Sequence, residues 1–321
     1  MKKCNYCGNY YNEINNDYDD IFCPFCGKEY HGEILPTVEN TENDFYSTDY
    51  KTNKTKYWIG LAAYFGMFYI GAVIIQVIVS FIVLILNGWI DGELIEGSVQ
   101  YEKYMNDTLA WSNLLIYLAT CAIILPFTFK LFKNDFYQLK KSPGNTFKWF
   151  GFGMIIMYVG IYASAFIIEI ISFIFDLDSG DSANQEAIIQ LMSSSGINFF
   201  IMTIMTVILA PILEEIIFRR CLFGIFKNRT ITTVILSAVI FAGIHTVPTC
   251  LSMIPALITG EETFDNFFLE FIYILNYLGQ GFALSIVYHK TRGNLIPCIM
   301  IHFANNLMAT ISIIFSILFQ F

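Results

Sequence analysis

Charged residues are scarce in this sequence. Asp, Glu, Lys and Arg make up 14 % of the 321 residues, whereas soluble domains carry about 25 %. The bases are outnumbered, with 18 Lys and Arg against 27 Asp and Glu, so the formal net charge is −9. This shortage excludes a nucleic-acid binder held by bulk positive charge, and it leaves too little polar surface for an ordinary soluble enzyme.

Apolar residues take the place of the missing charges. They make up 55 % of the chain, which includes 31 Phe, and the mean hydropathy is +0.55. Runs long enough to cross the hydrocarbon of a bilayer predict an all-α polytopic membrane protein with about seven transmembrane helices. The runs lie near 57–87, 110–132, 147–175, 197–218, 231–246, 267–288 and 295–320, the fifth being short.

The loops between these runs alternate in charge. Basic clusters fall at 51–56, 130–148, 219–229 and 290–292, and acidic loops separate them. Because basic loops stay in the cytoplasm, we expect a multi-pass protein of the cell membrane with a cytoplasmic N-terminus. No internal repeat of the kind found in inverted-repeat transporters is visible.

A small polar head precedes the first run. It carries two C-x-x-C pairs, each followed by Gly and separated from the other by fifteen residues: Cys4, Cys7, Cys23 and Cys26. Four thiolates at this spacing suit a tetrahedral, structural Zn²⁺ and resemble a zinc ribbon over residues 1–32. About thirty residues cannot bury enough apolar surface to fold unaided, so the metal would supply the fold.

The alternative for the head is a pair of disulfides in an exported domain. The absence of a hydrophobic signal segment before residue 32 favours reduced thiols and metal binding. His31 is interpreted as a surface residue rather than a further ligand. Residues 33–56 are expected to form a flexible acidic linker, and the net charge of −7 over residues 1–50 favours a cytoplasmic protein partner over nucleic acid.

Ionisable residues inside the apolar runs are few, and each is a functional candidate. The fourth run ends with Glu214-Glu215-Ile-Ile-Phe-Arg219, which places Glu215 and Arg219 at i and i+4 on one helical face. Glu214 points about 100° away and is free to face a cavity. Two close carboxylates in a low dielectric do not both ionise easily, which suits one of them to general-base work, although a structural ion pair explains the pair equally well.

Two later runs add further polar groups. Phe241-Ala-Gly-Ile-His245 supplies one imidazole, and His302-Phe-Ala-Asn-Asn306 supplies another with an amide on the same face. At 1.5 Å per residue these groups and Glu215 lie about 13–22 Å from the basic ends of their runs. They can therefore form one buried site open to the cytoplasm.

These three motifs, in this order on successive helices, resemble the CPBP family of intramembrane proteases. The family includes the CAAX prenyl endopeptidases and the Abi proteins linked to bacteriocin immunity. The resemblance covers roughly residues 145–321 of a transmembrane domain expected at 57–321, and it does not cover the zinc ribbon.

The resemblance implies a role for each residue of the motifs. Glu214 would be the general base and would activate a water with His245, while Glu215 and Arg219 would position it. His302 and Asn306 would stabilise the oxyanion of an attacked peptide carbonyl. The family is commonly called metalloproteases, and the sequence leaves open whether catalysis needs a metal.

An intramembrane endopeptidase acting on a membrane-bound or lipid-tethered peptide is therefore the leading hypothesis. Two alternatives remain: a proton- or ion-coupled carrier, and a non-catalytic adaptor whose zinc ribbon recruits a partner. The substrate, and whether it is prenylated, is not indicated. Other polar or reactive residues are expected to be structural: Glu169, Glu270, His289, Cys121, Cys221, Cys250 and Cys298.

Overall fold

The computed structural model divides the chain into two compact units, Met1–Thr48 and Asp49–Phe321. The residues that the structure describes are 2–3, 10–11, 50–89, 94–178, 180–226 and 230–319. In the first unit, strand β1 (Lys2–Lys3) pairs antiparallel with β2 (Tyr10–Tyr11). The four cysteines of the expected zinc ribbon lie outside the described residues, so the ribbon stays a prediction.

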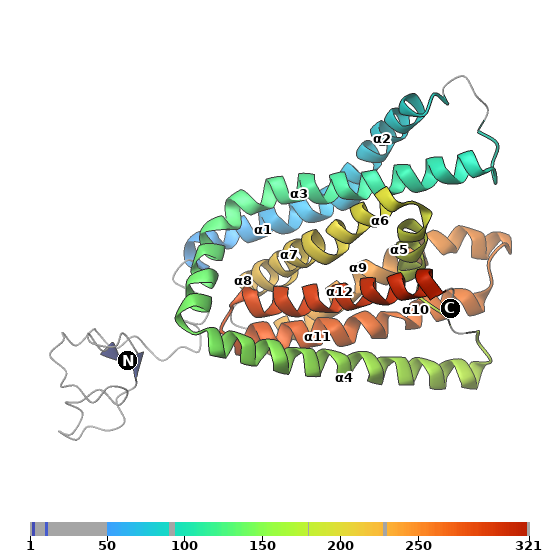
Figure 1. The fold of residues 1–321 in the computed structure, drawn as a ribbon. Coiled ribbons are helices and arrows are strands. Elements are labelled where there is room, and N and C mark those ends of the chain that lie inside the picture. Colours follow the sequence, from blue (N-terminus) through green and yellow to red (C-terminus); the bar gives the residue numbers. More distant parts are fainter. Residues whose placement is uncertain are drawn as a thin grey trace, which may run out of the picture. The chain divides into compact units, whose positions relative to one another are not determined.

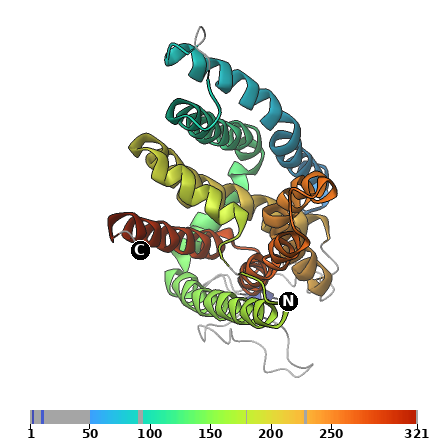
Figure 2. The same ribbon diagram turned by 90° about the vertical axis from the view of Figure 1, so that its right-hand side faces the viewer.

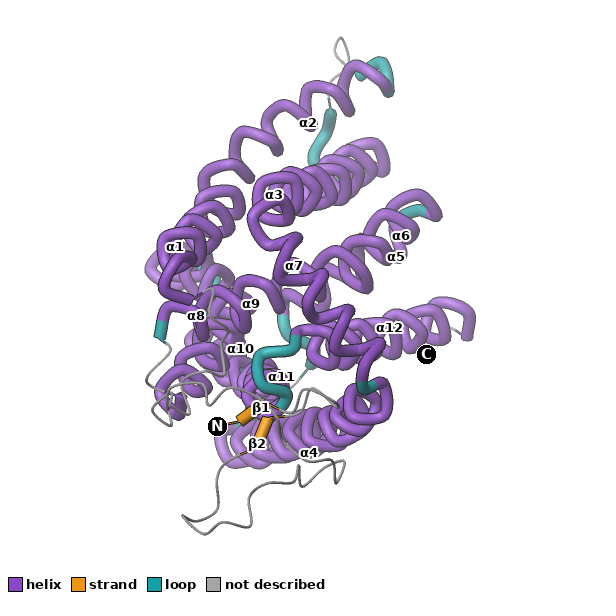
Figure 3. The backbone as a smooth tube through the Cα atoms, turned by 90° about the vertical axis from the view of Figure 1, so that its left-hand side faces the viewer, coloured by secondary structure: helices purple, strands orange, loops and turns teal. Residues whose placement is uncertain are grey.

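The second unit is helical wherever the structure describes it, apart from short connections (Figures 1 and 3). Its α-helices are α1 (Tyr50–Gly66), α2 (Ala72–Leu86), α3 (Val99–Lys141), α4 (Pro143–Phe175), α5 (Ala183–Ser194), α6 (Gly196–Thr203), α7 (Ala210–Glu214), α8 (Leu222–Ile225), α9 (Thr230–Thr259), α10 (Phe264–Ile272), α11 (Ile274–Lys290) and α12 (Leu295–Phe319). Three π-helical segments continue them: η2 (Met67–Gly71), η3 (Ile204–Leu209) and η4 (Glu215–Cys221).

Seven helical stretches of the described chain are long and apolar enough to cross a membrane, as expected. They are Lys54–Leu86, Val99–Phe129, Pro143–Phe175, Gly196–Ile225, Ile231–Thr259, Phe264–Lys290 and Leu295–Phe319. Large apolar side chains point outward from them, including Phe173 and Ile258, which are 87 % and 79 % exposed. Outward apolar side chains on this scale fit a protein whose solvent is lipid.

The expectation of a short fifth run at 231–246 is wrong. Helix α9 continues to Thr259 and contains Pro248 and Pro255. In water an interior proline ends or kinks a helix, but a membrane helix tolerates it when neighbouring groups satisfy the freed backbone. The sequence predicts a shorter run because His245, Thr246 and Pro248 interrupt the apolar pattern there.

The helices that carry polar groups lie together at the centre of the unit. Viewed along their axes, α3, α6, α12 and α4 form a curved row, with α9 and α11 to one side (Figure 2). Helix α11 packs on both α9 and α4. At the α4 crossing, a Cβ added to Gly279 would meet the backbone of Gly160 at 3.0 Å, so only glycine permits this close approach.

Candidate active site

The two acidic residues lie in the most buried stretch of the fourth span. Glu214 ends α7 and Glu215 begins η4, and the exposed fractions of the two residues are 2 % and 0 %. A charge at this depth costs several kcal/mol unless it is paired. The partners of each carboxylate therefore indicate what the pair is for.

Glu215 has a basic or imidazole group on each oxygen. Its Oε2 lies 3.1 Å from Nε of Arg219, as the i, i+4 spacing predicted, and its Oε1 lies 3.0 Å from Nδ1 of His302. The same carboxylate thus joins its own helix to α12. The second contact was not expected from the sequence, and it places Glu215 as the group that orients the imidazole of His302.

Arg219 is fully buried and is held from three directions. Besides Glu215, its Nη1 donates to Oγ of Ser237 at 2.6 Å, and its guanidinium carbon lies 5.2 Å from the ring centroid of Phe241. Ser237 in turn donates to the Phe218 carbonyl at 2.7 Å. A rigid, planar cation with these contacts holds the Glu215 carboxylate in one orientation.

Glu214 faces the two histidines. Its Oε2 lies 3.9 Å from Nε2 of His245 and 3.9 Å from Nε2 of His302, while its Oε1 accepts a hydrogen bond from the Tyr117 hydroxyl at 3.2 Å. Residues from the second, fourth, fifth and seventh spans meet here. The sequence predicted that Glu214 is free to face a cavity; the structure places its Oε2 toward the two imidazoles, without a hydrogen-bond partner among the described residues.

The side chain of His245 is 20 % accessible, whereas those of Glu214, Glu215 and His302 are 5 % accessible or less. The His245 ring stacks on Tyr277 of α11, with centroids 4.5 Å apart and an interplanar angle of 22°. The Tyr277 hydroxyl lies 3.1 Å from Oγ of Ser182 and accepts from the Asn184 amide at 3.0 Å. The start of α5 is thereby linked, through one tyrosine, to the imidazole.

Asn306 sits one turn beyond His302 but has a different partner. Its Nδ2 donates to the carbonyl of Thr206 at 2.9 Å. At the end of η3 the Ala210 N–H bonds to the carbonyl of Met205, five residues back. The next carbonyl in that pattern, that of Thr206, would need the N–H that Pro211 lacks, so Asn306 satisfies it instead.

Glu270, an acid of the sixth span, makes its contact elsewhere in the second unit. Glu270 accepts a hydrogen bond from the backbone N–H of Ala183 at 3.0 Å, the first residue of α5. A carboxylate at a helix N-terminus is a stabilising arrangement, which agrees with the structural role expected for Glu270. The four cysteines in the apolar runs are buried and unpaired by disulfides, as expected of small apolar residues.

Three contributors to the site were missed from the sequence: Tyr117, Ser237 and Tyr277. Each is a common residue type in an apolar run, and none is spaced by three or four residues from a charged residue in a way that would mark it as part of a site. Tyr117, for example, is 97 residues away from Glu214. Only the tertiary arrangement identifies them.

A zinc ion does not fit the side chains as they are placed. Among the described residues, no group of three or more His, Cys, Asp and Glu side chains has the geometry to hold a metal. Tetrahedral ligands at zinc lie about 3.4 Å apart, given metal–ligand distances of about 2.0–2.1 Å. Glu214 is 3.9 Å from each imidazole, and Nδ1 of His302 is already engaged by Glu215.

The fold and site together define a polytopic helical membrane protein with a buried carboxylate–imidazole cluster. Such a cluster can activate water and stabilise developing charge. Residues 196–308 match the family model described as type II CAAX prenyl endopeptidase, Rce1-like. The match spans all six residues of the three motifs, so this region of the chain is similar to the Rce1-like family.

A relative of similar sequence is an uncharacterized protein of Mycoplasma capricolum subsp. capricolum. It is 27 % identical over 228 residues, which cover 66 % of this chain and 59 % of the relative. The matched part is therefore less than two thirds of that protein's length. No solved structure matches the chain.

Proposed function

We propose that this protein is an intramembrane endopeptidase that hydrolyses peptide bonds of membrane-bound or lipid-tethered substrates. The observation that carries the proposal is the placement of the free Glu214 oxygen at 3.9 Å from Nε2 of both His245 and His302. That separation is too long for a direct hydrogen bond and suits groups that act on one shared water. The similarity to the Rce1-like family supports the same activity.

In the proposed reaction, Glu214 and His245 hold the attacking water. Its oxygen bonds to the peptide carbonyl carbon as one proton passes to Glu214, and the carbonyl becomes an oxyanion. The C–N bond then breaks and the proton moves from Glu214 to the leaving amine. The Tyr117 hydroxyl fixes one carboxylate oxygen so that the other faces the substrate. No step passes through a metal.

The oxyanion would be stabilised from α12. With Nδ1 of His302 engaged by Glu215, Nε2 is the ring nitrogen that faces the reaction and donates when protonated. The amide of Asn306 has two protons and gives one to the Thr206 carbonyl, which leaves the second for the oxyanion. Donors fixed before the reaction stabilise the charge without reorganising, which is the source of their effect.

The substrate would reach the site from the side of His245, because that ring is more accessible than Glu214 and His302. A peptide already anchored in or on the bilayer needs no separate capture step. We further propose a cytoplasmic N-terminus, with Cys4, Cys7, Cys23 and Cys26 holding a structural Zn²⁺. In this arrangement the zinc ribbon would bind a protein partner outside the membrane domain.

The test compares Glu214→Gln with Glu270→Gln, a matched change at a buried carboxylate outside the site. Membrane peptides from cells with each variant are compared by mass spectrometry, and a cleaved peptide is then assayed with purified protein. Glu214→Gln should slow cleavage by about 10²–10⁴-fold, the usual contribution of a general base, while Glu270→Gln should not. Both variants should insert, and Glu270→Gln should melt only slightly below the wild type, because its amide oxygen can still accept from Ala183.

Undiminished cleavage by purified Glu214→Gln protein would overturn the proposal. Proton-dependent solute flux in proteoliposomes, without hydrolysis of any peptide, would favour a carrier instead. A variant that fails to insert is replaced by Glu214→Asp, which keeps the charge and shortens the reach of the base.

A further inference from the structure

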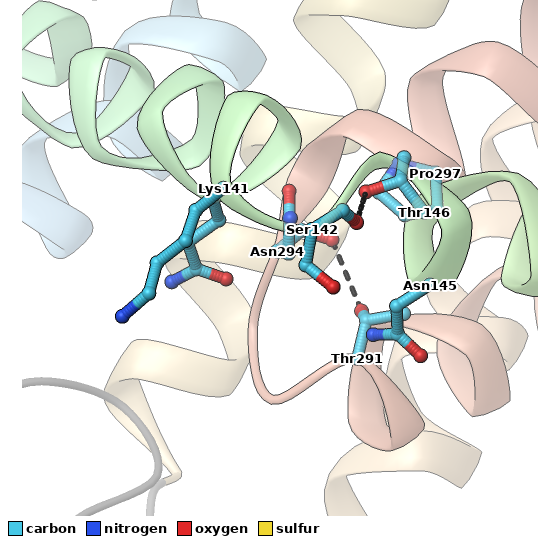
Figure 4. A pocket seen from close by; sticks show the side chains of 8 residues that line it. Lys141, Ser142, Asn145, Thr146, Thr291, Asn294 and Pro297 are labelled. Atoms are coloured by element: carbon cyan, nitrogen blue, oxygen red, sulfur yellow. Dashed lines mark hydrogen bonds between the residues drawn. The ribbon is translucent and has the colours of Figure 1, made fainter. Parts of the chain in front are cut away.

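A polar hollow lies away from the Glu–His cluster, where the α3–α4 corner meets the turn between α11 and α12 (Figure 4). Its volume is about 540 Å³, including the part open to solvent. The residues lining it are Gln138, Lys141, Ser142, Asn145, Thr146, Thr291, Asn294 and Pro297.

The hollow sits at the level where the apolar spans end. The second span stops at Phe129 and the third starts at Pro143, while the sixth stops at Lys290 and the seventh starts at Leu295. The lining residues therefore fall between two consecutive spans or in the first turn of the next one. This is the depth of lipid headgroups.

The lining is rich in hydrogen-bond donors and has no acid. Lys141 supplies a charge, and Gln138, Ser142 and Asn145 supply uncharged polar groups. None of these four side chains has a hydrogen-bond partner within the described part of the chain. Along α3 and α4 around the hollow, the acid Asp135 is paired with Arg220, which leaves the positive charge of Lys141 uncompensated.

Asn294 points more specifically to a ligand. It is only 5 % exposed, and its Oδ1 accepts from the Ile296 N–H at 2.9 Å at the start of α12. Its Nδ2 has no hydrogen-bond partner among the described residues, and the side chain lines the hollow. This amide donor is therefore available to an oxygen of a ligand in the hollow, while the rest of the side chain is held in place by the bond to Ile296.

Two long helices also begin at this hollow, α4 with 33 residues and α12 with 25. The Ser142 side chain makes no capping bond to α4, so the first turn of that helix keeps unsatisfied N–H groups. Helix N-termini carry partial positive charge and favour phosphate. Together with Lys141 and the Asn294 amide, they form a site for an oxyanion.

We propose that this hollow binds the phosphate of an anionic phospholipid headgroup. Its depth favours a lipid over free phosphate, and Phe147, 57 % exposed two residues after Asn145, offers an apolar surface for the acyl chain. Lys141 and Asn294 contact the phosphate oxygens, while the amides of Gln138 and Asn145 contact hydroxyls of the headgroup. The lipid would fix the α3–α4 corner at the membrane surface.

The test uses the full chain, delipidated in detergent, to which phosphatidylglycerol or phosphatidylcholine is added. Native mass spectrometry then measures how much of each lipid the protein retains. Asn294→Asp keeps the oxygen that caps α12 but replaces the donor by a negative charge. Lys141→Met removes the charge and keeps the side-chain length, and Lys56→Met, at an exposed lysine of α1, is the matched control. Retention of phosphatidylglycerol should fall about tenfold in the two hollow variants and not in the control.

Thermal melting with added phosphatidylglycerol or inorganic phosphate then shows whether the bound oxyanion is a lipid phosphate or a free phosphate. Stabilisation of the wild type by phosphatidylglycerol alone, lost in Asn294→Asp, supports the lipid. Equal stabilisation by inorganic phosphate, lost in the same variant, keeps the oxyanion site but overturns the lipid as its occupant. Equal retention of both lipids by wild type and variants overturns the proposal altogether.

Discussion

Two neighbouring arginines on one helical segment have different surroundings. Arg219 pairs with Glu215, and Arg220 pairs with Asp135 of α3. Both acids are nearly or fully buried. Glu215, however, also contacts the imidazole of His302 from another span, and the adjacent Glu214 accepts a hydrogen bond from Tyr117 of a third span. Within the described part of the chain, Asp135 contacts Arg220 and the backbone at the start of α12.

The comparison shows that burial and pairing do not by themselves mark a catalytic residue. Asp135 is beyond the apolar part of α3, and burial raises its pKa to about 6 even though Arg220 opposes the shift. We expect this pair to be a structural bridge between two helices, in which case a raised pKa alone does not identify a catalytic group. What distinguishes Glu215 is the convergence of independent groups on its neighbour Glu214.

The largest effect is expected for Glu215→Gln. The amide cannot neutralise Arg219, so stability should fall by about 3–5 kcal/mol, and His302 loses its orienting charge. Turnover per folded molecule should fall by about 10²-fold because the imidazole is no longer held in place. Thermal melting in detergent and peptide cleavage measure the two effects, and normal turnover by the folded fraction would remove Glu215 from the mechanism.

Asp135→Ala should resemble the first variant in stability and differ from it in catalysis. Removing the whole side chain leaves the guanidinium of Arg220 without its acceptor, which should cost about 3 kcal/mol and lower the melting temperature, whereas kcat of the folded protein stays unchanged. Because burial raises the pKa of Asp135 to about 6 in the folded protein, the wild type should lose stability as pH rises from about 4 through 6, and Asp135→Ala should not. A tenfold loss of kcat would break the comparison between the two pairs.

Tyr277 provides a smaller, graded test of positioning. Tyr277→Phe keeps the ring stacked on His245 but cuts the link to Ser182 and Asn184, while Tyr277→Leu removes the stack as well. We expect kcat to fall about tenfold for Leu and less for Phe, since aromatic pairs contribute about 0.5–1.5 kcal/mol. A pH–rate profile that shifts only in the Leu variant would show that the effect acts through the imidazole of His245. Equal kcat in the wild type and both variants would contradict a positioning role for Tyr277.

The smallest effect on cleavage is expected at the first unit. Replacing Cys4 and Cys7 together by Ser should remove one bound zinc per chain, as measured by elemental analysis. Turnover of a purified membrane substrate should change less than about twofold, because the ribbon and the site are proposed to be separate domains. Loss of both zinc and membrane-domain folding would show that they are not.

Hydropathy and helical spacing were enough to predict the seven spans and the Glu215–Arg219 pair, because both depend on local sequence. The meeting of Glu214 with His245 and His302 was predicted from depth along each helix and from the resemblance of the motifs. The end of the fifth span was missed, since a proline has different consequences in lipid and in water. Local patterns do not carry that information.

The tertiary contacts of the motif residues could not be predicted from the sequence. His302 was expected to face the substrate, yet one of its nitrogens is engaged by Glu215, and this depends on how α12 is rotated against η4. Tyr117 and Tyr277 are two of 19 tyrosines in the chain, with nothing local to single them out. Contacts between distant segments follow from packing, which single-sequence periodicity does not encode.

The bond from Asn306 to the Thr206 carbonyl limits how this part of the chain can vary in length. A residue gained or lost between Thr206 and Glu214 would turn the carboxylates by about 100° around the helix axis while the upstream anchor stayed in place. The acids would then face lipid instead of imidazole. Insertions that are harmless in the loops of this protein should therefore be intolerable in this one segment.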